Sequence, residues 1–147
     1  MSRVRAVVDT NVLVSGVISR GAPHQVLLAW LRGAFQLVAS RALYDEIEAV
    51  LGRPRIRERY RIGDAEVALL LQRLSSCIES RRSVTRLGVE VRDPEDRHVL
   101  AAAVGGKVEY LVTGDNDLLV LRDHPAVAPL RVVTVQEFLA VLADDAC

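Results

Sequence analysis

Acidic residues stand in or beside apolar runs in four separate parts of this chain of 147 residues. Asp9 follows "AVV" and Asp115 follows "YLVTG", while Asp96 lies in "DPEDRHVLAAA" and Glu46 lies inside "SRALYDEIEAVL". A carboxylate at the end of a buried strand loses its hydration and needs a compensating partner. If the fold gathers these acids, some of them hold a proton unless a cation lies among them.

Oxygen ligands of this kind suit Mg²⁺ or Mn²⁺, and no cluster of cysteines and histidines in the sequence competes for a softer metal. The two cysteines, Cys77 and Cys147, are isolated from each other. A cation held by carboxylates polarises a phosphate and activates a water, which is the chemistry of phosphodiester hydrolysis. Asp117, two residues after Asp115, is a fifth candidate acid.

Each acid also has a purely structural explanation. Asp93, before a proline, is typical of a helix N-cap, and Asp96 could stabilise the first turn of the same helix. Asp115 could be a turn residue in "TGDND", and Glu46 lies among other acids on a face that could be solvated. Asp9 is the hardest to explain in this way, because it ends a buried strand.

Short β-branched runs alternate with helical patterns along the chain. This alternation predicts an α/β fold with a mostly parallel sheet and helices on both faces. Ligands of such sheets bind beyond the carboxyl ends of the strands, where Asp9 and Asp115 are expected. The expected strands cover 4–8, 35–39, 110–113 and 130–133, with 82–91 ambiguous, and the expected helices cover 22–31, 40–51, a segment from 64, 93–104 and a segment after the capping box "TVQE" at 134–137.

Length and composition are those of a globular protein, so we expect one domain over residues 1–147. The net charge is zero, which argues against a general affinity for nucleic acid or for anionic membranes but allows a local patch. No apolar stretch approaches the ~20 residues of a membrane span, and no signal peptide is visible. We therefore expect a cytoplasmic protein without a membrane partner.

Four motifs, "VVDTNVLVSG", "LYDEIEAVL", "DPEDRHVLAAA" and "YLVTGDNDLL", follow one another across most of the chain. In order and separation the sequence resembles the PIN-domain family, in particular the subgroup of toxins from toxin–antitoxin pairs. The resemblance implies a Rossmann-like three-layer α/β/α sandwich with a mostly parallel sheet of about five strands. It also implies an Mg²⁺- or Mn²⁺-dependent endoribonuclease acting on single-stranded RNA, with an antitoxin protein and a second copy of the chain as partners.

The same resemblance assigns roles to individual residues by motif match. The catalytic acids would be Asp9, Glu46, Asp96 and Asp115. Of these, Asp9, Asp96 and Asp115 would bind the metal, while Glu46 would hold a water or help to activate the nucleophile. Asn11 and Thr113 would orient the carboxylates, and Asp117 matches a frequent further acid of the family.

Candidate contacts to the RNA backbone lie in "RPRIRERYRIG", residues 53–63, and beside Asp96. Arginine binds phosphate through two parallel hydrogen bonds, so the candidates are Arg53, Arg55, Arg57 and Arg97. Alternate arginines in a helix scatter around it rather than forming one stripe, so a solvated surface segment is an equal alternative.

Other functions are possible for this pattern. One alternative is an RNA-binding or regulatory module with the same fold and no catalytic activity. A phosphatase of the haloacid dehalogenase type would need a second aspartate at position 11, where this chain has Asn11. A dinucleotide-binding domain would need a glycine-rich loop after the first strand, and none follows Asp9.

Overall fold

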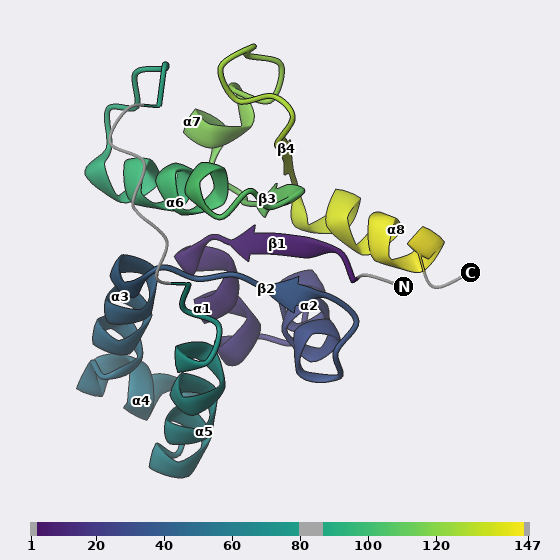
Figure 1. Cartoon of the computed structure of the whole chain (residues 1–147). Helices are drawn as coiled ribbons and strands as arrows, with labels where there is room; N and C mark the ends of the chain where they lie inside the picture. The colour runs from purple at the N-terminus through teal and green to yellow at the C-terminus, as the bar shows by residue number, and fades with distance from the viewer. Residues whose placement is uncertain (1–2, 80–86, 146–147) are drawn as a thin grey trace.

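The computed structural model describes residues 3–79 and 87–145 of the chain (Figure 1). The ambiguous segment 82–91 lies partly outside this range, and its described part, residues 87–91, forms no regular strand. No helix within the described residues is both long and apolar enough to cross a membrane.

A parallel sheet forms the centre of the molecule. Its strands are β1 (Arg5–Val8), β2 (Gln36–Leu37), β3 (Tyr110–Val112) and β4 (Arg131–Val133), in the order β2-β1-β3-β4. The family resemblance implied about five strands, whereas the described residues form four. Beyond β2, the described residues extend the sheet by an isolated parallel bridge between Ala39 and Ile78.

The two faces of the sheet are both buried, as expected for a parallel sheet between layers of helices. Because side chains alternate along a strand, Ala6 and Val8 of β1 enter one core and Val7 enters the other. Leu111 of β3 pairs in register with Val7 and shares its core, and Val112 does the same with Val8. The predicted α/β class with a parallel sheet is confirmed.

Eight helices surround the sheet in the described part of the chain. Helices α1, α2, α3, α5 and α8 contribute to the core that contains Val8, and α6 and α7 cover the other face (Figure 1). Helices α4 and α5 both pack against α3. Their bounds are α1 (Thr10–Ile18), α2 (Ala22–Leu31), α3 (Arg41–Leu51), α4 (Pro54–Tyr60), α5 (Asp64–Ser75), α6 (Pro94–Gly105), α7 (Asn116–Leu119) and α8 (Val135–Asp145).

Local capping explains where two of these helices begin. The Ser40 hydroxyl accepts a hydrogen bond from the Leu43 N–H at 3.1 Å, which starts α3. Before α8, the Glu137 N–H donates to Thr134 Oγ1 at 3.1 Å, and the Thr134 N–H donates to Glu137 Oε1 at 3.0 Å. The capping box expected from "TVQE" is thus confirmed.

The first strand passes directly into a helix without a loop. Asp9 is the residue between β1 and α1, and its carbonyl oxygen accepts from the N–H groups of Val12 and Leu13 at 3.0 and 3.2 Å. The apolar run that follows Asp9 in the sequence therefore lies in α1. This abrupt change of direction holds Asp9 at the carboxyl end of the sheet.

Candidate metal centre

The pairing of β1 with β3 brings the first and last acidic motifs together. Val8 and Val112 are partners in the parallel register, so Asp9 and Thr113 both follow the sheet at the same edge. The Asp9 N–H donates to the Val112 carbonyl at 2.9 Å, which extends the ladder to this point. Residues more than a hundred positions apart in the sequence thus become neighbours.

Thr113 connects two of the acids through its hydroxyl group. Its side chain is completely buried, and Oγ1 donates a hydrogen bond to Asp9 Oδ2 at 2.8 Å. The same oxygen accepts from the Asp115 N–H at 3.0 Å. Thr113 therefore links the Asp9 carboxylate to the backbone of Asp115. The orienting role that the motif match implies for Thr113 stays a prediction.

Asp96, Asp115 and Asp117 form a compact group of carboxylates. Each offers one oxygen, and these three oxygens lie within 4.8 Å of one another. Asp115 Oδ1 also accepts from the Asp117 N–H at 2.9 Å and so caps the short helix α7. Among the described residues, Asp9 and Glu46 lie outside this compact group.

Asp96 is the least satisfied member of the group. Its side chain is only 6% exposed, and its Oδ2 atom is buried without a hydrogen-bond partner among the described residues. Burial, together with the hydrogen bond and charge of Asp115 and the charges of Asp93 and Asp9, raises the pKa of Asp96 from its ordinary 3.8 to about 7. A carboxylate in this position is costly as long as nothing positive lies beside it.

Asp9 belongs to the same electrostatic network. It is 5% exposed, and its burial raises the pKa of its carboxyl group, with the charge of Asp115 acting in the same direction. The hydrogen bond from Thr113 and the N–H groups of Asn11 and Thr10 lower this pKa in part. The two buried acids, Asp9 and Asp96, are therefore coupled to each other and to Asp115.

These features fit a hard divalent cation. The donors are all oxygens, three of them are close enough to share one ion, and one buried oxygen has no other partner. Bound positive charge would stabilise the ionised form of Asp96 and offset the desolvation that raises its pKa. Asp117 is exposed and Asp115 is half-buried, so the group is open to solvent and to a substrate on that side.

The remaining predicted site residues lie on helices α3 and α1. Glu46 lies half-buried on α3, a helix that contacts both α1 and α6. Asn11 is exposed in the first turn of α1. The motif match assigns Asp9 to the metal ligands and Asp117 to a supporting role. In the structure Asp117 lies in the compact group and Asp9 lies outside it. The roles of all these residues stay predictions.

Two of the candidate RNA-binding arginines are already engaged in the fold. Arg57 donates from Nε to the Leu51 carbonyl at 2.6 Å and forms an ion pair with Asp64. Arg97 donates to the Val91 carbonyl at 2.9 Å. Arg53 and Arg55 are exposed at the start of α4.

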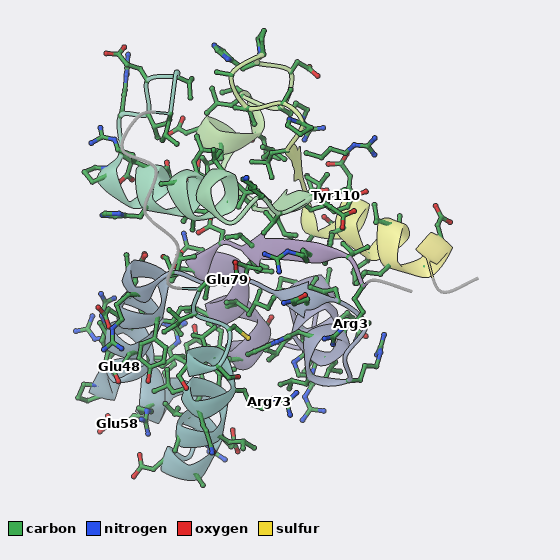
Figure 2. All side chains as sticks on the ribbon, viewed as in Figure 1. Arg3, Glu48, Glu58, Arg73, Glu79 and Tyr110 are labelled. Atoms are coloured by element: carbon green, nitrogen blue, oxygen red, sulfur yellow. The ribbon has the colours of Figure 1, made fainter. Side chains whose placement is uncertain are left out.

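Acidic residues are interspersed with the arginines on this part of the surface. Glu48 and Glu58 are exposed on α3 and α4 and project outward (Figure 2). The surface of α4 is therefore mixed in charge rather than uniformly basic, and contact of its arginines with RNA stays a prediction.

Two residues near the site were not predicted to belong to it. The sequence predicts only a helix N-cap at Asp93, yet its charge contributes to the raised pKa of Asp96. Thr10 has a buried hydroxyl without a hydrogen-bond partner among the described residues. Its position directly after Asp9 was the only available signal, because nothing local distinguishes an unsatisfied threonine from a satisfied one.

Comparison with known proteins supports the motif analysis. No curated protein matches the chain. A family model described as PIN domain matches residues 5–117, a span that begins with β1 and includes Asp9, Glu46, Asp96, Asp115 and Asp117. Since this match covers well over half of the sequence, the chain belongs to the PIN-domain family.

Proposed function

We propose that this protein is an endoribonuclease that hydrolyses phosphodiester bonds of single-stranded RNA with Mg²⁺ or Mn²⁺. PIN domains are generally metal-dependent nucleases. The observation that carries the proposal for this chain is the buried, unpartnered Oδ2 of Asp96 beside Asp115 and Asp117. A bound cation would offset the repulsion among these three carboxylates, which otherwise favours a protonated Asp96.

The residues divide into those that hold the cation and those that position them. Asp96, Asp115 and Asp117 offer the close oxygens. Thr113 holds the Asp9 carboxylate by its Oδ2 atom, so that Asp9 keeps one orientation beside this group. When bound, a divalent cation polarises a phosphate oxygen and lowers the pKa of a water molecule. Asp9, held in place, is then suited to accept a hydrogen bond from the attacking water.

The substrate and the biological role rest on the motif resemblance. Single-stranded RNA, a toxin role within a toxin–antitoxin pair and an antitoxin partner are the choices that this subgroup favours. The exposed carboxylate of Asp117 supports a substrate that approaches from solvent. A flexible single strand can bring one phosphate to a cation held at the half-buried Asp115 more readily than a rigid duplex can.

Cleavage of labelled single-stranded RNA tests the activity. We expect cleavage with Mg²⁺ or Mn²⁺, none with EDTA, and a loss of at least about 100-fold in the Asp9→Asn variant, which is typical of removing a group that positions the reaction. Asp123→Asn is the matched control, because Asp123 is an exposed acid between α7 and β4. Equal cleavage by both variants would refute the proposal.

A second measurement separates a catalyst from a binding module. If RNA binds but no divalent metal supports cleavage, while calorimetry still detects Mn²⁺ binding, the protein is an RNA-binding PIN domain without this activity. For the toxin role, we expect expression of the wild-type chain to stop bacterial growth and expression of Asp9→Asn to leave growth intact. Growth inhibition by both forms would contradict a role that depends on catalysis.

A further inference from the structure

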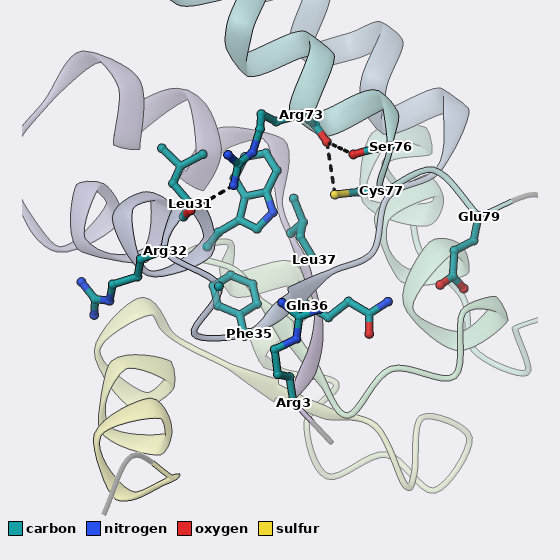
Figure 3. Close-up of a pocket in the computed structure, with 12 residues that line it drawn as sticks. Arg3, Leu31, Arg32, Phe35, Gln36, Leu37, Arg73, Ser76, Cys77 and Glu79 are labelled. Atoms are coloured by element: carbon teal, nitrogen blue, oxygen red, sulfur yellow. Dashed lines mark hydrogen bonds between the residues drawn. The ribbon is translucent and has the colours of Figure 1, made fainter. Parts of the chain in front are cut away.

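A pocket lies at the end of the sheet opposite the acids. Its volume is about 460 Å³, within the range of small-molecule sites. Its walls come from the segment before β1, the end of α2, β2, and the end of α5 with the turn that follows it (Figure 3). Arg3 lines it, and because Asp9 lies six residue steps further along a nearly extended chain, the two sites are roughly 20 Å apart.

The lining of this pocket carries an excess of positive charge. It contains Arg3, Arg32 and Arg73 against a single acid, Glu79. That acid is already engaged, since Arg5 Nη2 donates to both of its carboxylate oxygens at 3.0 Å. The whole chain has no net charge, so this local excess is not a consequence of composition.

The guanidinium groups retain free hydrogen-bonding capacity. Arg73 donates from Nη2 to the Leu31 carbonyl at 2.9 Å, which anchors it at the C-terminal end of α2 and leaves its other donors available. The guanidinium groups of Arg3 and Arg32 make no hydrogen bond or ion pair with any residue in the described part of the chain, although the Arg32 N–H donates to the Leu28 carbonyl. Figure 3 shows the three arginines placed around Phe35, and Figure 2 labels Arg3 and Arg73 on the whole molecule.

The rest of the wall combines an apolar floor with polar groups. Phe35 and Trp30 line the pocket and are almost fully buried. Gln36 and Val38 donate their N–H groups to β1, so alternation turns the N–H and C=O of Leu37 to the outer edge of the sheet. Leu37 lines the pocket, which therefore offers backbone groups as well as side chains to a ligand.

We infer that this pocket binds a phosphorylated ligand of nucleotide size. Arginine forks match the geometry of phosphate oxygens. Three arginines in a lining whose one acid, Glu79, is already paired with Arg5 favour a dianionic phosphate over a single carboxylate. The volume accommodates such a ligand, and the site is independent of the acidic group at the other end of the sheet.

Calorimetry with adenosine 5′-monophosphate at low salt tests this site. EDTA is present throughout, so that no cation bridges the nucleotide to the acids. We expect binding of the nucleotide, no binding of adenosine, and a loss of about tenfold in affinity for Arg32→Gln and for Arg3→Gln. Both arginines are exposed, so circular dichroism should show that these variants fold normally.

Arg20→Gln is the matched control, because Arg20 is exposed just before α2 whereas the pocket borders the other end of that helix. Its affinity should equal that of the wild type. Absence of nucleotide binding at millimolar concentration would overturn the inference, and so would equal weakening by all three variants or binding of citrate as tight as that of the nucleotide. A 5′-phosphorylated oligonucleotide that competes identifies an RNA end as the ligand, and one that does not identifies a free nucleotide.

Discussion

Replacement of Asp96 by asparagine should stabilise the protein in the absence of metal. The Asp96 carboxyl is 6% exposed, and its folded-state pKa is raised from 3.8 to about 7. Folding therefore favours the protonated form, so this group costs nothing below pH 4 and its cost grows as the pH rises to about 7. Above that pH the wild type carries the full cost of a buried charge, whereas the neutral, nearly isosteric asparagine does not.

The size of this effect follows from the pKa. A rise from 3.8 to about 7 at 1.36 kcal/mol per unit sets an upper limit of about 4 kcal/mol. Asp96 interacts directly with Asp115, and the side chains can relax, so about half of this value, ~2 kcal/mol, is expected at pH 8. For a chain of this length, that corresponds to an increase in Tm of roughly 4–8 °C.

Thermal unfolding at pH 5 and pH 8 in EDTA measures this difference. The Tm of the variant should exceed that of the wild type at pH 8. The difference in Tm should narrow at pH 5, because the wild-type Asp96 carboxyl is then largely protonated. Addition of Mn²⁺ should reverse the order, since a cation at 100 times its Kd stabilises the wild type by about 2.7 kcal/mol and the variant by less. Asp123→Asn should follow the wild type throughout.

Two results would refute this reasoning. If Asp96→Asn lowers Tm at pH 8 in EDTA, the carboxylate stabilises the metal-free fold and its burial is compensated from within the chain. If Mn²⁺ stabilises the variant as much as the wild type, Asp96 does not contribute to the cation site.

Three further predictions concern residues around the site and a distant helix start. Thr113→Val should leave the protein folded but reduce RNA cleavage about tenfold or more, because the buried acid it orients loses its hydrogen bond; unchanged kcat would contradict this. Glu46→Gln should reduce cleavage in the same assay, while the exposed Glu48→Gln on the same helix should not. Glu137→Ala should lower stability at pH 7 by up to about 1 kcal/mol, the value of an exposed cap. Hydrogen bonds from the backbone and side chain of Thr134 lower the pKa of Glu137 below its ordinary 4.5. The difference in unfolding free energy between the wild type and Glu137→Ala should therefore be fully present above pH 4.5 and disappear as the pH falls through the folded-state pKa. Urea unfolding repeated at decreasing pH measures this difference.

Local features were predictable from the sequence because they depend on near neighbours in the chain. The bounds of α2, the Ser40 cap and the capping box before α8 follow from hydrophobic periodicity and from hydrogen bonds across three residues. The parallel sheet follows from buried apolar runs that alternate with helices. The position of Asp9 at the edge of that sheet follows from the same pattern.

Tertiary structure decided which of these groups meet and at what cost. The sequence could not show that Asp117 joins Asp96 and Asp115 in the compact group, or that the Thr113 hydroxyl links two acids. Nor could it show that the arginine-lined pocket lies at the opposite end of the strands. Distances between side chains and the loss of their hydration depend on how distant segments pack, and local sequence carries no record of either.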